Sequence, residues 1–148
     1  MSISQYNNLL ELFYNQLQKE KADQIFLKSL KDPNSKFTWQ DTYESIIKLS
    51  DELDMFIEKN DRCLLISENR PEWMISDLAI MLAKGVTVPA YTTYTERDYE
   101  YLIDDCEPSV VIVSDEVQYK KIKNVIKNKK FIKKILSFES FKLSLIHI

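Results

Sequence analysis

The stretch from residue 63 to residue 113 constrains the fold more than any other part of the sequence. It begins with an apolar run of strand length, residues 63–67, and ends with another, Val110–Val113. Continuous apolar runs this short are typical of strands that are buried on both faces, as in parallel sheets. The segments between the runs are too long for tight hairpins and long enough for helical crossovers. This stretch therefore predicts a parallel α/β layer.

The segment after the first run has the start and stop signals of a helix. Pro71 suits the first helical position, because its φ is already helical and its missing N–H would have no helical partner there. Residues 73–83 are apolar on almost every face, which predicts a largely buried helix. Gly85, the only glycine in the chain, is expected to end this helix by taking a positive φ. A short strand should follow, with Pro89 at its end.

Three polar residues are expected to cap helices. Thr38 and Thr95 are each followed three residues later by an acidic residue, Asp41 and Asp98 respectively, in the manner of a capping box. Asp115 precedes residues 117–126, in which apolar residues recur at helical spacing. The helix that begins after Thr38 is expected to run for about 20 residues and to cover the sheet with its apolar face.

The two ends of the chain complete the predicted fold. Apolar residues at three- and four-residue spacing predict an amphipathic helix over residues 6–17. Residues 24–29 and 36–38 flank an Asp-Pro-Asn turn and are expected to form a strand pair. The last strand is expected over Phe131, Ile132, Ile135 and Leu136. These elements predict an α/β fold with a parallel sheet, flanking helices and a small amino-terminal strand pair.

The residue counts exclude several kinds of catalytic site. One glycine is too few for a Walker-type phosphate loop or a dinucleotide-binding fingerprint, both of which need several. The single histidine, His147, is a poor triad base, and with Cys63 and Cys106 it cannot complete a four-ligand zinc site. The two cysteines are interpreted as buried structural thiols. We therefore expect no catalytic residue and no metal site in this chain.

Charge is distributed unevenly along the chain. Residues 1–116 carry a net charge of −11 and residues 117–148 a net charge of +8, although the whole chain carries only −3. Most of the basic residues lie between Lys120 and Lys134, where they form either a solvated helix face or a peripheral contact with an anionic membrane. That stretch has no arginine and few aromatic residues, so we expect no nucleic-acid binding. No secretory signal is evident, which makes the cytoplasm the expected location.

Five short segments carry a resemblance to a known family. They are Asp61-Arg62, Ser-Glu-Asn-Arg-Pro-Glu-Trp at 67–73, Asp-Leu-Ala-Ile at 77–80, residues 84–95 and residues 101–113. These segments resemble the amino-terminal part of the AMP-binding, or adenylate-forming, enzymes. The closest likeness is to the long-chain fatty-acid CoA ligases, or acyl-CoA synthetases, and it extends over residues 38–136.

The resemblance implies a two-step reaction for the family. A fatty acid attacks the α-phosphate of Mg²⁺-bound ATP to give an acyl-adenylate and pyrophosphate, and the thiol of coenzyme A then displaces AMP. The family uses a Ser/Thr/Gly-rich phosphate loop, a ribose-binding acidic residue, an adenine pocket and a mobile lid with a catalytic lysine. Residues 1–148 match none of those parts. The resemblance therefore implies a single incomplete domain: a truncated ligase that is inactive alone, binds no cofactor itself and has the missing remainder of the enzyme as its partner.

One candidate substrate-binding loop follows the first buried strand, because ligands of open parallel sheets bind beyond the carboxyl ends of the strands. Its candidate residues are Asn69 and Arg70. They either contact the substrate or the missing subdomain, or they serve the fold. In the second case Asn69 caps a helix, and Arg70 pairs with Glu68 or Glu72.

The second candidate loop follows the strand that begins at residue 86. Tyr91, Thr92 and Thr93 form a polar and aromatic segment there. This segment either lines the active-site cleft or packs on its own sheet.

A free-standing flavodoxin-like binding or signalling module is the competing hypothesis for function. A receiver of that class needs an acidic pair after the first strand and a phosphoacceptor aspartate after the third. Glu68 is a single acidic residue, and Asp115 fits the phosphoacceptor position only approximately.

Overall fold

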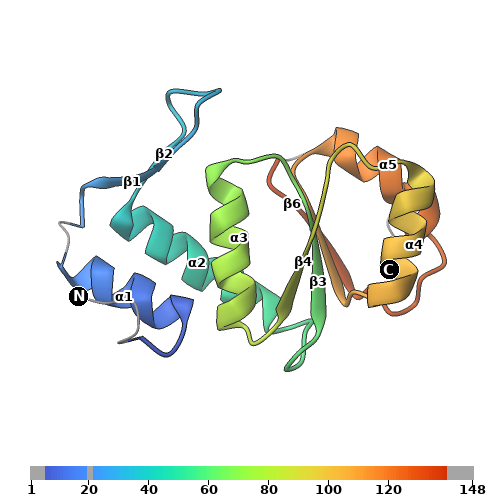
Figure 1. Cartoon of the computed structure of the whole chain (residues 1–148), viewed down its shortest axis with the longest axis horizontal. Coiled ribbons are helices and arrows are strands. Elements are labelled where there is room, and N and C mark those ends of the chain that lie inside the picture. Colours follow the sequence, from blue (N-terminus) through green and yellow to red (C-terminus); the bar gives the residue numbers. More distant parts are fainter. Residues whose placement is uncertain (1–5, 20–21, 140–148) are drawn as a thin grey trace.

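The computed structural model describes residues 6–19 and 22–139 of the 148-residue chain. A four-stranded sheet is covered by helices on both faces, and a separate two-stranded sheet lies near the amino terminus (Figure 1). The elements in chain order are α1 (Leu9–Lys19), β1 (Ile25–Lys28), β2 (Lys36–Thr38), α2 (Trp39–Leu53), β3 (Arg62–Ile66), α3 (Pro71–Leu82), β4 (Val86–Ala90), α4 (Glu96–Cys106), β5 (Val110–Val113), α5 (Glu116–Ile126) and β6 (Lys134–Ser137). The predicted fold class is confirmed.

The main sheet is parallel throughout, with the strand order β4-β3-β5-β6. In the centre, Cys63 of β3 lies beside Val110 of β5, which confirms the side-by-side arrangement of the two apolar runs. Pro89 is the penultimate residue of β4, which pairs with β3 alone. The N–H of Val86 donates to the carbonyl oxygen of Asp61, just before β3. Because N–H groups alternate in direction along a strand, the nitrogen of Pro89, three residues on, faces away from β3, where β4 has no partner strand. Its missing N–H therefore removes no ladder hydrogen bond.

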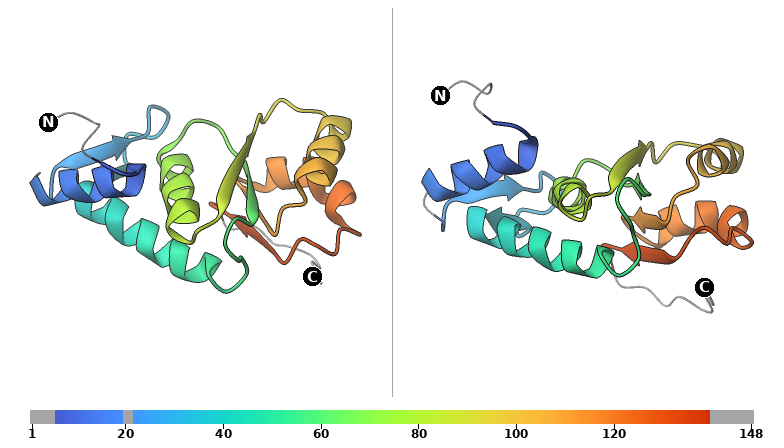
Figure 2. Two further views of the ribbon diagram at one scale, coloured as in Figure 1. Left: turned by 60° about the horizontal axis from the view of Figure 1, so that its bottom comes forward. Right: turned by 90° about the horizontal axis from the view of Figure 1, so that it is seen from below.

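The residues of β3 divide between two hydrophobic cores, because successive side chains of a strand point to opposite faces. Cys63 and Leu65 belong to the core that includes residues of α2 and α3. Leu64 and Ile66 belong to the core that includes residues of α4 and α5. All four side chains are completely buried. Figure 2 shows α4 and α5 on one side of the sheet and α2 and α3 on the other, with α1 and the β1–β2 hairpin beyond them.

The three predicted helix caps are present. Thr38 and Thr95 accept hydrogen bonds from the backbone N–H of Asp41 and Asp98, and both aspartates bond back to the cap residue. Asp115 Oδ1 accepts from the backbone N–H of Gln118 at 2.9 Å. Each cap supplies a partner to an N–H group that the first helical turn leaves unpaired. The amino-terminal strand pair is also confirmed, since β1 and β2 pair antiparallel.

The expectation that Gly85 takes a positive φ was wrong. Lys84 has the left-handed conformation instead, with φ of 64°. Gly85 lies where space is tight, because a Cβ there would lie 3.0 Å from Ile57 Cδ1 and 3.1 Å from Ile80 Cγ2. The chain turns into β4 against buried side chains, and a glycine allows that close approach.

Two predicted boundaries also differ from the structure. The last strand begins at Lys134, so Phe131 and Ile132 precede it. Both pack against the core under α4 and α5 without joining the ladder. α2 ends at Leu53, earlier than expected, and Ile57 still reaches the core from the turn that follows. Within the described ranges, no helix combines the length and the apolar character that crossing a membrane would require.

Candidate functional site at the carboxyl edge of the sheet

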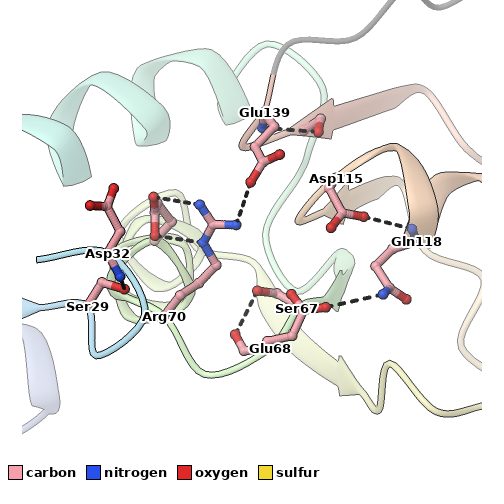
Figure 3. A network of polar contacts seen from close by, with 10 residues as sticks. Ser29, Asp32, Ser67, Glu68, Arg70, Asp115, Gln118 and Glu139 are labelled. Atoms are coloured by element: carbon pink, nitrogen blue, oxygen red, sulfur yellow. Dashed lines mark hydrogen bonds and ion pairs between the residues drawn. The ribbon is translucent and has the colours of Figure 1, made fainter. Parts of the chain in front are cut away.

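Four loops meet at one edge of the main sheet, because all its strands are parallel and end there. They follow Ile66 of β3, Ala90 of β4, Val113 of β5 and Ser137 of β6. Open parallel sheets bind their ligands beyond this edge. Both candidate loops from the sequence lie here, side by side, since β3 and β4 are neighbours. Figure 3 shows the polar contacts that link the loops after β3, β5 and β6.

Carboxylates surround the guanidinium of Arg70 in the loop between β3 and α3 (Figure 3). Its Nε and Nη2 donate to the two carboxylate oxygens of Glu72 at 2.9 and 3.0 Å. Its Nη1 donates to Glu139 Oε1 at 3.0 Å, and the guanidinium carbon lies 5.5 Å from the centroid of the Phe138 ring. A bidentate arginine–carboxylate pair of this kind is among the stronger hydrogen-bonded ion pairs in proteins.

The contacts of Arg70 stabilise the charged forms of both partners. The hydrogen bonds to Glu72 raise the pKa of Arg70 above its usual value, and Glu139 adds to this effect against the opposing influence of burial. Burial is the largest single effect on Glu72 and favours its neutral form. The hydrogen bonds with Arg70, a hydrogen bond from the backbone of Glu72 itself and the charge of Arg70 together hold the pKa of Glu72 below its usual value. An anionic substrate at Arg70 would therefore compete with two carboxylates. The ion pair with Glu72, one of the two alternatives for Arg70, is present.

Gln118 of α5 connects the loops after β3 and β5. Its Nε2 donates to Glu68 Oε1 at 3.2 Å, and its backbone N–H donates to Asp115. The Gln118 side chain is only 5% exposed, and its Oε1, like the buried Ser114 Oγ, has no hydrogen-bond partner among the described residues. Sequence reasoning missed Gln118, although its helical spacing to Ile122 and Ile126 marks it as facing the sheet.

The candidate loop after β4 is fastened to α4 and α5 through its backbone. The hydroxyl of Tyr99 donates to the carbonyl oxygen of Tyr91 at 2.7 Å, and Lys121 Nζ donates to the carbonyl oxygen of Thr92. The Tyr91 side chain itself is 72% exposed and meets the ring of Tyr94 edge-on. Thr93 is also exposed, as is Asn69 in the neighbouring loop. The backbone of this loop is therefore fixed by hydrogen bonds, while the side chains of Tyr91 and Thr93 are exposed to solvent.

The groups that could carry acid–base or metal chemistry at this edge are already engaged in the fold. Glu68 accepts from Gln118, and Asp115 caps α5. In residues 6–19 and 22–139, no three or more histidine, cysteine, aspartate or glutamate side chains are grouped closely enough to hold a metal ion. Burial, with a smaller effect of the Asp61 charge, raises the pKa of the Cys63 thiol to about 12, and burial also raises the pKa of Cys106. Both thiols are therefore protonated and poor nucleophiles at neutral pH.

Comparison with known proteins supports one family for this chain. Residues 13–144 match the family model described as AMP-binding enzyme. The long-chain-fatty-acid–CoA ligase of Bacillus subtilis (strain 168) is 33% identical over 89 residues, which are 60% of this chain and 16% of that protein. The long-chain-fatty-acid–CoA ligase ACSBG1 of Rattus norvegicus is 25% identical over 87 residues, which are 59% of this chain and 12% of that protein. The chain thus spans only a small part of the length of these curated relatives.

A solved structure shares the fold. The crystal structure of the anthranilate CoA ligase AuaEII in complex with anthranoyl-AMP aligns with 93% of this chain and 26% of its own, with a TM-score of 0.80 and 20% sequence identity. The shared fold and the family match over residues 13–144 are consistent with each other. The chain belongs to the AMP-binding enzyme family.

Proposed function

We propose that this chain forms one wall of the active-site cleft of an ATP-dependent long-chain fatty-acid CoA ligase. In that reaction a fatty acid, ATP and coenzyme A give acyl-CoA, AMP and pyrophosphate. The observation that carries the proposal is the family match over residues 13–144. The names of the curated relatives favour a long-chain fatty acid as the acyl substrate.

The carboxyl edge of the sheet is the part of the chain that would face the cleft. Tyr91, Thr93 and Asn69 are exposed there, and the backbone that carries Tyr91 is held by Tyr99. A held backbone with exposed side chains suits a surface that contacts a ligand or a neighbouring part of the same enzyme. Arg70 would instead stabilise this part of the fold and not contact the ligand, because its guanidinium is already bonded to Glu72 and Glu139.

The described residues do not fit ATP and Mg²⁺ as a complete site. Phosphate groups require free cationic or backbone N–H donors, and Mg²⁺ prefers oxygen ligands that the protein leaves available. At this edge Arg70 is bonded to two carboxylates, Asp115 caps α5 and Glu68 accepts from Gln118. We infer that polypeptide other than the described residues holds the phosphates, the metal and coenzyme A, and that this chain alone is inactive.

Fatty-acid-dependent exchange between ATP and labelled pyrophosphate tests the proposal. The purified 148-residue chain should show no exchange above background with palmitate or with shorter acids, while a full-length long-chain fatty-acid CoA ligase does so under the same conditions. Exchange that depends on fatty acid and on this chain would contradict the proposed division of labour. It would mean that the phosphate-handling groups lie within these residues.

A further inference from the structure

The outer face of α4 and α5 carries two stripes of opposite charge. The exposed acidic residues of α4 and its caps lie on both flanks of its exposed side, and together they are called the acidic stripe: Glu96, Asp98, Glu100, Asp104, Asp105 and Glu107. The exposed lysines of α5 and the turn after it form the basic stripe, defined by Lys120, Lys123, Lys127 and Lys130. Each stripe contains one exposed residue of the opposite sign, Arg97 and Glu116 respectively.

The two stripes lie next to each other on the same side of the sheet. Buried residues of both helices, Tyr99 and Ile103 of α4 and Ile122 and Ile126 of α5, share one core, so the opposite helix faces look outward together (Figure 2). Lys129 Nζ pairs with Asp104 where the stripes meet. Within the stripes, Lys120 also pairs with Glu116, and Asp98 accepts hydrogen bonds from Thr95. The rest of each stripe faces solvent.

The same face exposes apolar side chains between the charges. Tyr101 of α4 is 75% exposed and Val117 of α5 is 61% exposed. Exposed tyrosines are enriched at protein interfaces, because they bury a large ring and keep a polar hydroxyl at its end. The face thus combines complementary charge with apolar side chains suited to contact.

We propose that this face is a contact surface for a second copy of the chain. The two helices run in the same direction, because each leads from the end of one parallel strand back to the start of another. A two-fold axis between the helices, and parallel to them, lays α4 of each copy on α5 of the other. The acidic stripe then meets a basic stripe twice, as a self-complementary two-fold interface requires.

The charges favour this partner over an anionic lipid surface or a nucleic acid. A flat anionic partner that reached the basic stripe would also meet the acidic stripe beside it, and like charges brought together cost binding energy. Several lysines of the 120–134 segment are also paired within the fold: Lys120 with Glu116, Lys133 with Asp61 and Lys134 with Glu52. A second copy, in contrast, presents the opposite charge to both stripes.

The size of the face predicts a weak, salt-sensitive dimer. Two helices of 11 residues each offer a face about 16 Å long and about 20 Å wide. That area is well below the roughly 800 Å² per partner of a standard stable interface. Association should therefore need high protein concentration, and salt should weaken it because the Debye length falls to about 3 Å at 1 M.

Sedimentation equilibrium of the 148-residue chain tests the proposal. At low salt the average mass should rise with concentration from 17.5 kDa towards twice that value, and 0.5 M NaCl should reverse the rise. A mass that stays at that of one chain up to millimolar concentration in low salt would overturn the proposal. So would a dimer that salt leaves unchanged.

Charge reversal identifies the face. Lys123→Glu with Lys127→Glu gives both stripes a net negative charge. Glu100→Lys, Asp105→Lys and Glu107→Lys together give both a net positive charge. Neither the double nor the triple variant should dimerise alone, with at least about a tenfold loss in association constant from like-charge repulsion. An equimolar mixture of the two should dimerise, because each stripe then meets its opposite. Variants that dimerise alone, or a mixture that does not, would overturn the proposal.

Matched controls separate this face from net charge and from other partners. Lys48→Glu with Lys59→Glu makes the same change in net charge at exposed positions elsewhere and should leave dimerisation intact. Circular dichroism establishes that each variant is folded. Loss of dimerisation in this control would overturn the proposal. Binding of the wild-type chain to phosphatidylserine vesicles that is lost in the Lys123 and Lys127 double variant, with no dimer in solution, would overturn it in favour of a membrane contact.

Discussion

At the scale of single residues, Asp61, which directly precedes β3, contacts three other segments at the amino edge of the sheet. Its Oδ2 accepts from the backbone N–H of Glu58 at 3.0 Å and from Ser109 Oγ at 2.8 Å, and Lys133 Nζ lies 3.6 Å away. The hydrogen bond from Glu58 is the largest of the effects that lower the pKa of this carboxyl, and it outweighs burial. Asp61 therefore stabilises the fold as a carboxylate.

We predict that Asp61→Asn lowers the free energy of unfolding at pH 7 by about 1 to 2 kcal/mol, a value reduced for partial exposure. A carboxyl with a lowered folded-state pKa contributes its full stability above its unfolded value of 3.8, and that contribution is lost as pH falls through the folded value. The cost of the substitution should therefore shrink between pH 5 and pH 2. Urea unfolding across this range measures it, with exposed Asp51→Asn as the control. A cost independent of pH would contradict the assignment.

Gly85 gives a second prediction at this scale. Gly85→Ala should destabilise the chain by about 1 to 2 kcal/mol, because its new methyl group would crowd Ile57 and Ile80, which are both buried. Lys84→Gly should be neutral or stabilising, since Lys84 holds the positive φ that a glycine adopts without strain. Urea unfolding of both variants tests this reversal of the sequence-based expectation. An alanine variant as stable as wild type would show that the site can relax.

At the scale of secondary structure elements, Arg70 ties the start of α3 to the end of β6. It bonds Glu72 of α3 and Glu139 just after β6, and Phe138 donates its backbone N–H to Val113 of β5. The contact joins residues that are 69 positions apart in the sequence. These contacts connect the ends of β3, β5 and β6 at the carboxyl edge of the sheet.

We predict that Arg70→Met destabilises the chain by about 1 to 3 kcal/mol, because it leaves the half-buried Glu72 without its partner. Protection of the Phe138 amide against hydrogen exchange should fall more than protection of the amides in β3. Lys120→Met, which breaks the exposed pair with Glu116, is the matched control and should change stability by less than about 0.5 kcal/mol. Unchanged exchange at Phe138 in Arg70→Met would contradict the proposed tie.

Elements set by local chemistry could be predicted from the sequence, and elements set by distant partners could not. The caps at Thr38, Thr95 and Asp115 involve residues within three positions of one another, so their pattern is visible in the sequence. The start of β6 depends on its register with β5, where Lys134 lies beside Val110. Apolar residues just before that register pack on the core without entering the strand.

The same distinction holds for the candidate site. That the loops after β3 and β4 share an edge follows from the parallel arrangement alone. That Glu139 occupies Arg70 does not, because no local signal links two residues so far apart. Whether Asn69, Tyr91, Thr92 and Thr93 contact a substrate remains a prediction.

At the scale of the whole molecule, the chain should be less stable than an independent domain of its length. It matches only 12 to 16% of the length of the curated long-chain fatty-acid CoA ligases described above. An interface of about 600 to 1,500 Å² with the rest of such an enzyme would contribute several kcal/mol at about 25 cal/mol per Å² of apolar surface. Whole domains are stable by only about 5 to 15 kcal/mol.

We therefore predict that the isolated chain binds a hydrophobic dye in the absence of denaturant and unfolds over a broad temperature range. Calorimetry and dye fluorescence measure these two properties. A sharp, fully reversible transition with no dye binding would contradict the prediction.

The most direct test of the central claim is the thioester-forming activity of a chimera. The matched segment of the Bacillus subtilis long-chain-fatty-acid–CoA ligase would be replaced by its counterpart in this chain, and formation of acyl-CoA from palmitate, ATP and coenzyme A would be measured. The account predicts activity clearly above that of the same enzyme with the segment deleted. A folded chimera that forms neither acyl-adenylate nor acyl-CoA would contradict it.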